Sequence, residues 1–199
     1  ILADGSVPER WTALDLLSQA EHDAAAQVIL ASPDMSYLEA VVGEMSALLP
    51  QMRRRKIIEA SLEAKSAFIK TRDLSDAVSI ANRIAPEHLQ LAVSDARGLL
   101  PEVQHAGAIF LGGHSSEAIG DYVAGPSHVL PTSGTARYAS VLGVYDFQKR
   151  SSVIDISAVG ANTLGRTAST IAFAEGLEAH ALAALARGDC STRSDNEES

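Results

Sequence analysis

Residues Gln27 to Asp34, Gln-Val-Ile-Leu-Ala-Ser-Pro-Asp, form the clearest strand-to-helix junction in the chain. Residues 27–31 are a short apolar run of strand length, and Ser32-Pro33-Asp34 is a turn and a helix-start signal. A helix is expected to follow as far as Leu49, because Pro50 cannot continue it. The stretch therefore predicts a strand, a tight turn and a helix in succession.

The same alternation continues on both sides of this junction. Residues 9–26 before it have the spacing of a helix. After it, the patterns predict helices over 53–65 and 74–84, strands over 67–70, 88–93 and 106–111, and a short helix near Asp95. Strands that alternate with helices form βαβ units, so we expect a largely parallel sheet with ligand sites at the carboxyl ends of its strands, where Gly112-Gly113 lies.

The pattern changes after Ser151. Residues 152–156 are a brief β-like run, and an alanine-rich segment from about 162 to 187 predicts a helical appendage. Its apolar residues recur at helical spacing and form a face that has to pack on another surface, for which a partner subunit is a candidate. We therefore expect an α/β domain over residues 1–148, a helical segment over 149–188 that docks on a partner subunit, and a disordered tail over 189–199.

Composition limits the classes of function. A chain of 199 residues that is 46% hydrophobic can form one sizeable domain with an appendage. Its net charge of -9 argues against a nucleic-acid-binding surface, which needs clustered Lys and Arg. The basic run 53–56 lies in a predicted helix and is interpreted as a solvated face, with an anion or partner contact as the alternative. Since we find neither a membrane span nor a signal peptide, we expect a soluble, cytoplasmic protein.

The two ends of the chain carry further indications. The single cysteine, Cys190, excludes an intrachain disulfide framework and a multi-cysteine zinc site. It lies in a polar terminal segment, so we interpret it as a thiol in a disordered tail. The first residue, Ile1, is not Met, and the opening residues 1–5 read like the interior of a larger protein. We therefore expect this chain to be a fragment.

The segment from Gly120 to Arg137 is a candidate site because it sets the ionisable Asp121 and His128 among loop-forming Gly and Pro residues. A second candidate is the pair Gln19 and His22. These residues are three apart in a predicted helix, so both side chains can reach one metal ion or substrate. On spacing alone, a solvated helix face is the more common explanation of such a pair.

Two further pairs contain acids and imidazoles. Glu87 and His88 are adjacent at the start of a predicted strand, where they could act as an acid-base pair or form an exposed strand end. Glu175 and His180 are five apart, so their directions on a helix differ by about 140° and spacing does not aim them at one ligand. No glycine-rich fingerprint for a nucleotide phosphate is present in this sequence.

Four separated motifs, in this order and at this spacing, resemble those of histidinol dehydrogenase: Gln19 to His22, Pro86 to Leu89, Gly120 to Thr132, and Ala174 to His180. The resemblance extends from Ile1 to about Arg187 and corresponds to roughly the C-terminal half of that enzyme. It implies an α/β fold: an incomplete Rossmann-like parallel-sheet domain, carrying most zinc and substrate residues, with a C-terminal helical appendage.

The resemblance also implies roles for individual residues. It makes Gln19, His22, Asp121 and His180 the ligands of one zinc ion per site. It makes Glu87 and His88 the catalytic acid-base pair, and all six of these residues substrate contacts together with His128 and Glu175. Most NAD contacts would belong to an N-terminal half that this sequence lacks. The active sites would be shared across a homodimer, with the last helix reaching into the partner's site.

The activity implied by the resemblance is the NAD-dependent oxidation of histidinol through histidinal to histidine, the last steps of histidine biosynthesis. His88 would take the alcohol proton, and Glu87 would activate water to hydrate the aldehyde. The family commonly has Asn where this chain has Ser127. Because the N-terminal half is missing, we expect the chain alone to be inactive. The alternatives are a related dehydrogenase of another amino alcohol or diol, and a non-catalytic zinc-binding remnant.

Overall fold

The computed structural model describes residues 1–187. It divides into one unit from Ile1 to Phe147 and a second that begins at Gln148, and each unit is described by itself. The predicted tail 189–199, with Cys190, lies outside the described residues.

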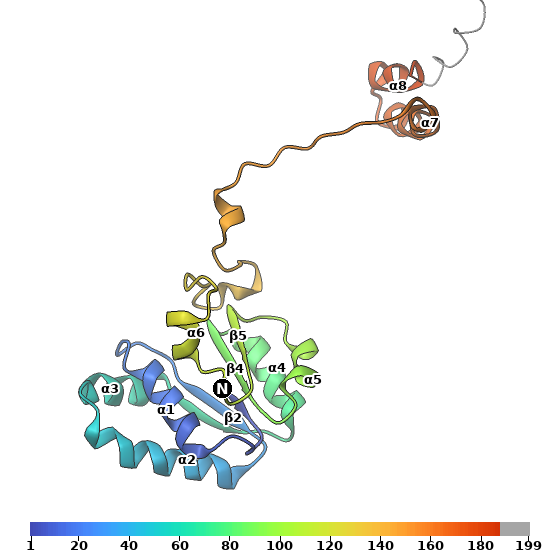
Figure 1. Ribbon diagram of the computed structural model, residues 1–199. Coiled ribbons are helices and arrows are strands. Elements are labelled where there is room, and N and C mark those ends of the chain that lie inside the picture. Colours follow the sequence, from blue (N-terminus) through green and yellow to red (C-terminus); the bar gives the residue numbers. More distant parts are fainter. Residues whose placement is uncertain (188–199) are drawn as a thin grey trace, which may run out of the picture. The chain divides into compact units, whose positions relative to one another are not determined.

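The first unit is built on a five-stranded sheet in the order β3-β2-β1-β4-β5, and every neighbouring pair is parallel (Figure 1). Its strands are β1 (Leu2–Ala3), β2 (Ile29–Ser32), β3 (Ala67–Lys70), β4 (His88–Ala92) and β5 (Ala108–Leu111). The α/β class and the parallel sheet are thereby confirmed. The sequence patterns missed β1, the central strand, because two residues are too few to show a period.

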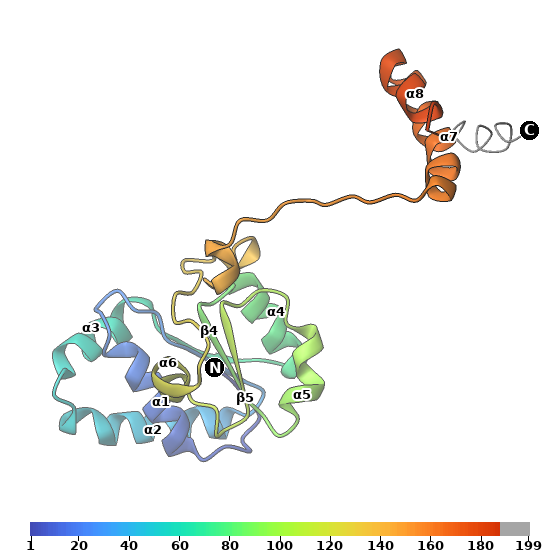
Figure 2. The same cartoon turned by 45° about the horizontal axis from the view of Figure 1, so that its top comes forward.

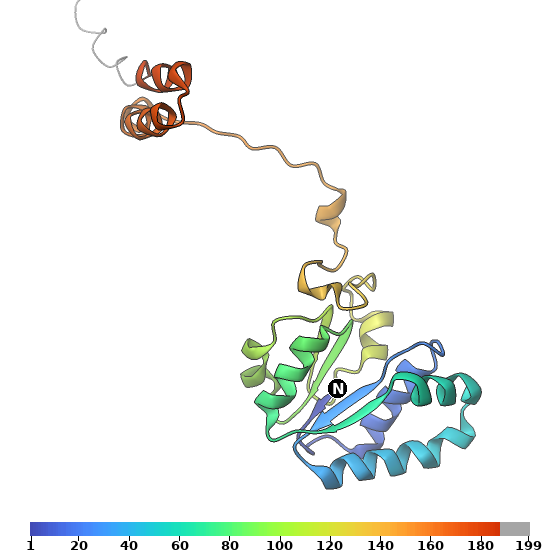
Figure 3. The same cartoon turned by 180° about the vertical axis from the view of Figure 1, so that it is seen from behind.

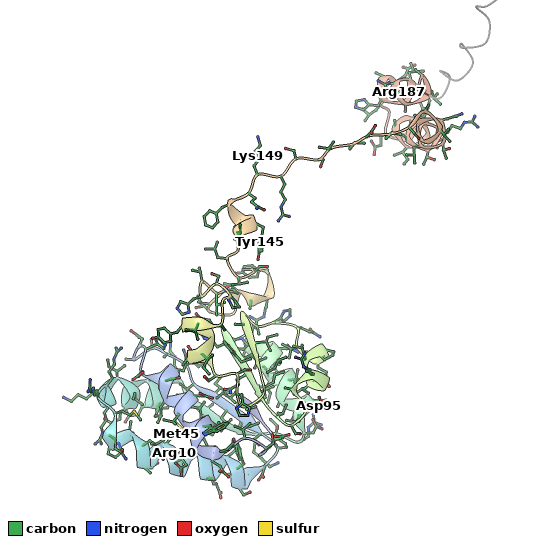
Figure 4. The ribbon with its side chains drawn as sticks, in the orientation of Figure 1. Arg10, Met45, Asp95, Tyr145, Lys149 and Arg187 are labelled. Atoms are coloured by element: carbon green, nitrogen blue, oxygen red, sulfur yellow. The ribbon has the colours of Figure 1, made fainter. Side chains whose placement is uncertain are left out.

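Helices cover both faces of this sheet. They are α1 (Glu9–Ala20), α2 (Met35–Leu48), α3 (Arg55–Lys65), α4 (Leu74–Ile84), α5 (Ala96–Leu99) and α6 (Glu117–Val123). One buried core joins α1, α2 and α3 to the sheet through residues such as Leu17, Val41 and Ile58. A second core joins α4 and α5 to the opposite face through residues such as Val78 and Leu99, so α1 and α4 lie on opposite sides (Figure 3). Met45 of α2, which belongs to the first core, is labelled in Figure 4.

The helix that follows the opening junction begins where its sequence predicts. The carboxylate of Asp34 accepts hydrogen bonds from the backbone amides of Ser36 and Tyr37, which caps α2. Asp73 caps α4 in the same way, through the amide of Asp76. At its other end α4 closes on Ala85 in the left-handed conformation, directly before Pro86, Glu87 and His88.

Several predicted boundaries in the first unit differ from the structure by one or two residues, and two larger differences affect the site. The first helix ends at Ala20 instead of residue 26, so His22 lies in the turn after α1. Asp121 lies on α6 and not in a loop, because Ser116 caps a short helix through the amide of Ile119. This helix was not predicted because it has only seven residues and Gly120, which has a low helix propensity, lies in its middle.

The second unit consists of two helices, α7 (Ala158–Ala174) and α8 (Glu178–Leu185), which pack on each other. The helical appendage is confirmed, but it is broken near Gly176, whose φ of 76° is the left-handed conformation that ends helices. The β-like run 152–156 forms no strand. Several large apolar side chains of these helices are exposed, including Leu164, Ile171 and Phe173. Within residues 1–187, no helix has both the length and the apolar character needed to span a membrane.

Candidate functional site

The candidate site lies at the amino-terminal edge of the sheet. His88 is the first residue of β4, and Gln19 lies in the last turn of α1. Both line a cavity of about 480 Å³, together with Glu87 and Glu117. Helices of a βαβ domain run antiparallel to the strands, so their C-terminal ends come to this edge. The expectation of a site at the carboxyl ends of the strands, near Gly112-Gly113, is corrected accordingly.

Three side chains from β4 and α6 converge here. One ligand atom each of His88, Glu117 and Asp121 lies within 4.8 Å of the others, the only such metal-binding arrangement found in residues 1–187. His88 Nε2 is 3.8 Å from Asp121 Oδ1 and 4.0 Å from Glu117 Oε1. Asp121 Oδ1 also lies 3.1 Å from His128 Nδ1, which makes Asp121 the centre of the group. The short helix α6, which lies against α1, carries both carboxylates (Figure 2).

His88 is the most enclosed imidazole of the group. Its Nε2 is buried and has no hydrogen-bond partner, and its ring packs against Phe110 with ring centroids 6.0 Å apart. Burial lowers the pKa of His88, although the charges of Glu87 and Asp121 act in the opposite direction. The ring is therefore kept in the neutral form, which can accept a proton or ligate a metal.

Glu117 is a site residue that the sequence patterns missed. Burial first, and then the neighbouring Asp121 carboxyl, raise the pKa of Glu117 to about 7. Two carboxyl groups this close favour a nearby positive charge. The signal that could have revealed Glu117 is its spacing of four from Asp121, which places both on one face of a helix.

The residues present fit a metal ion. The buried, unpartnered Nε2 of His88 is an imidazole nitrogen available to a ligand, and carboxylate oxygens and imidazole nitrogens are atoms that Zn²⁺ accepts. The C-terminal end of α1 points its partial negative charge toward the same edge, which also favours a cation.

Comparison with known proteins assigns the family. Residues 1–188 match the family model described as Histidinol dehydrogenase. The chain belongs to the histidinol dehydrogenase family. The resemblance drawn from the four sequence motifs is thus confirmed, and it covers both units of the structure.

Individual members of the family agree with this assignment. The chain is 57% identical to histidinol dehydrogenase of Pseudomonas fluorescens over 184 residues, which are 92% of this chain and 42% of that protein. It is 57% identical to that of Chromobacterium violaceum over 187 residues, 94% of this chain and 43% of that one. The crystal structure of histidinol dehydrogenase from Elizabethkingia anophelis matches with a TM-score of 0.87 at 33% identity, over 94% of this chain and 43% of that chain. This member of the family therefore spans well under half the length of these relatives.

The structure brings most of the predicted site residues to this one place. His22 Nε2 lies 4.0 Å from Glu117 Oε1, although its side chain is 59% exposed. Gln19, Glu87 and His88 line the cavity. Ser127 forms a local turn, in which its hydroxyl accepts a hydrogen bond from the amide of Val129 at 3.2 Å, next to His128.

Two predicted site residues lie in the second unit. Glu175 is the C-terminal cap of α7, and His180 lies in α8. Both side chains are exposed. The sequence pattern predicted one final helix that contains both residues, whereas Gly176 divides this segment into two helices.

Proposed function

We propose that this chain supplies the zinc-binding and proton-transferring part of a longer NAD-dependent enzyme that oxidises L-histidinol through L-histidinal to L-histidine, the last steps of histidine biosynthesis. The observation that carries the proposal is the convergence of His88, Glu117 and Asp121 at one cavity in a member of the histidinol dehydrogenase family. A chain with a single cysteine suits the reducing cytoplasm, the compartment we propose for it.

The proposed zinc ligands are Gln19, His22, Asp121 and His180. Zinc at this place would supply a template and a Lewis acid. Support for three of the four ligands comes from the first unit, where Gln19 lines the cavity and His22 and Asp121 flank Glu117. His180 belongs to the second unit, and in our proposal it comes from the partner subunit.

His88 is the proposed base and Glu87 its partner. A buried neutral imidazole can take the proton of the alcohol while a hydride leaves the carbon for NAD. The aldehyde must then add water before a second hydride can leave, and in our proposal the carboxylate of Glu87, which lines the same cavity as His88, deprotonates that water. Both residues line one cavity, so the aldehyde formed in the first step would not have to move far before the second step.

The remaining substrate contacts come from both units. His128 lies beside Asp121, and Glu175 and His180 would contact the substrate across a homodimer interface. We accordingly propose residues 1–148 as the α/β domain and 149–188 as the helical segment that docks on the partner. The exposed apolar side chains of α7 and α8 support this docking. Most NAD contacts would lie in the part of the relatives that this chain does not cover.

The test is oxidation of histidinol by the full-length enzyme that contains this chain. With NAD and zinc present, we expect two NADH for each histidinol consumed, because oxidation of an alcohol to an acid releases two hydrides. Other amino alcohols and diols, tested at the same NAD and zinc concentrations, should react far more slowly. We expect no turnover by the 199-residue chain alone.

Three results would contradict the proposal. Faster oxidation of another alcohol than of histidinol would favour a related dehydrogenase. Zinc binding without any oxidation by the full-length protein would favour a non-catalytic remnant. A monomeric mass of that protein in light scattering would exclude the shared site.

A further inference from the structure

Glu117 links parts of the site that are far apart in the sequence. It is the first residue of α6, and its Oε1 lies 4.0 Å from Nε2 of His22 and 4.0 Å from Nε2 of His88. His22 follows α1, whereas His88 begins β4. One carboxylate oxygen thus faces an imidazole from the proposed zinc ligands and the imidazole of the proposed base.

The orientation of this carboxylate is fixed from several sides. Its Oε2 accepts a hydrogen bond of 3.4 Å from the hydroxyl of Ser18 on α1, which directs Oε1 toward the two imidazoles. Ser116 caps α6 directly before Glu117. The side chain is 12% exposed, so little solvent competes for its oxygens.

A carboxylate in this place has a definite physical effect on the rings around it. Both contacts are 4.0 Å long and are electrostatic rather than hydrogen-bonded, so the carboxylate favours the orientation of each ring that keeps Nε2 toward Oε1. Because the pKa of Glu117 is raised to about 7, a cation bound nearby also favours its ionised form, and the ionised carboxylate in turn favours the cation. Such neighbours of metal ligands typically change metal affinity by about tenfold to a hundredfold when they are removed.

We propose that Glu117 is a positioning residue of this site, which orients the imidazoles of His22 and His88 beside Asp121. The inference rests on the proposed function and deepens it: the zinc-binding residues and the proton-transferring residue share one carboxylate. Glu117 acts through the two rings and does not itself react.

The test compares Glu117→Gln and Glu117→Ala with the control Glu63→Gln in the full-length enzyme. Glu63 is an exposed residue of α3 and lies outside the cavity. Three quantities are measured: the Kd for zinc by chelator competition, the absorption spectrum of the cobalt-substituted protein, and kcat and KM for histidinol. Circular dichroism checks that each variant is folded.

We expect the Kd for zinc to rise about tenfold to a hundredfold in Glu117→Ala and less in Glu117→Gln, which keeps an oxygen toward Ser18. The cobalt spectrum should shift in both variants, because the ring of His22 is no longer held. The value of kcat should fall more than KM changes, since the base His88 is also released. Glu117→Asp, which keeps the charge, should recover part of the loss, and Glu63→Gln should match the wild type.

Wild-type zinc affinity and an unchanged cobalt spectrum in both Glu117→Gln and Glu117→Ala would overturn this inference. If Glu117→Ala does not fold, the nearly isosteric Glu117→Gln decides alone. If the wild type binds zinc but does not oxidise histidinol, the proposed function fails, and the zinc and cobalt measurements still judge the role of Glu117. A wild type that binds no zinc would overturn both.

Discussion

His88 occupies a position in which two opposing influences act on one imidazole. Burial favours its neutral form, whereas the charges of Glu87 and Asp121 favour the protonated form. A base needs this balance: a ring that is neutral before the reaction and has carboxylates near enough to stabilise the proton it takes up. The same ring could also ligate a metal, so its role has to be tested separately from that of the proposed zinc ligands.

His88→Asn separates these two roles. If His88 is the base, kcat for histidinol should fall by about a hundredfold or more while the zinc content stays at the wild-type value. Activity and zinc content are measured on the same preparation. Loss of zinc would instead indicate that His88, Glu117 and Asp121 hold the metal themselves.

Asp4 shows how a carboxylate at the opposite edge of the sheet supports the fold. It follows β1, and its Oδ2 accepts hydrogen bonds from the amide and the hydroxyl of Ser94, just after β4, at 2.8 and 2.7 Å. Desolvation acts to raise its pKa, but the hydrogen bonds from Ser6 and Ser94 outweigh it and lower the pKa of Asp4 to about 2. Asp4 thus joins the ends of two neighbouring strands.

Asp4→Ala should therefore destabilise the protein in a pH-dependent way. A carboxylate with a lowered pKa in the folded state stabilises it above the unfolded-state pKa, and this contribution is lost as the pH falls from about 4 to about 2. Because Asp4 is only partly buried and solvent screens its charge, we expect its carboxylate to contribute about 1 kcal/mol to the free energy of unfolding at pH 7, less than its pKa alone implies. Urea unfolding at several pH values measures it, with the exposed Asp155→Ala as control. Equal destabilisation at pH 7 and pH 2 would contradict this account.

Gly120 lets α6 lie close to β5. A Cβ at this position would collide with the ring of Phe110, which in turn packs against His88. In α2, by contrast, a Cβ at Gly43 would meet nothing within 4 Å. The same substitution should therefore have opposite effects in these two helices.

We expect Gly43→Ala to stabilise the protein by about 0.5–1 kcal/mol, because alanine restricts the unfolded chain and favours the helix. Gly120→Ala should destabilise it by about 1–3 kcal/mol, since the collision outweighs the gain in helix propensity. It should also weaken zinc binding, because α6 carries Glu117 and Asp121. Thermal unfolding and zinc analysis of both variants give the comparison, and stabilisation by Gly120→Ala would show that α6 is not held against Phe110.

Elements with clear end signals could be predicted from the sequence, and those fixed by packing could not. The strand 67–70 and the helix 74–84 have the predicted bounds, the helix behind the cap Asp73. By contrast, β1 is two residues long, and α6 contains Gly120, so neither shows a period. The motifs indicated His88 and Asp121 as site residues. The spacing of Glu117 from Asp121 is compatible with a shared helix face, but its position beside His22 and His88 depends on the packing of α6 against α1.

The edge at which the site forms is a property of the whole sheet. The general rule for parallel sheets places ligand sites at the carboxyl ends of the strands, where the loops that follow the strands lie. Here the groups come from the end of α1, the start of β4 and the helix α6, which meet at the amino edge. A sequence read one element at a time does not show that these three ends converge.

The two units have complementary roles in the proposal. The first unit holds Gln19, His22 and Asp121, and the second holds His180 in α8. In this account neither unit completes the zinc site, which explains why a chain with its acid-base residues in place would still depend on a partner subunit.

Zinc analysis of Asp121→Asn and His180→Ala in the full-length enzyme tests this account most directly. Asp155→Asn, in the exposed segment before α7, is the matched control. The account predicts that each of the two site variants loses zinc and histidinol-dependent NADH formation together, while the control keeps both. Wild-type zinc content and rate in Asp121→Asn would contradict it.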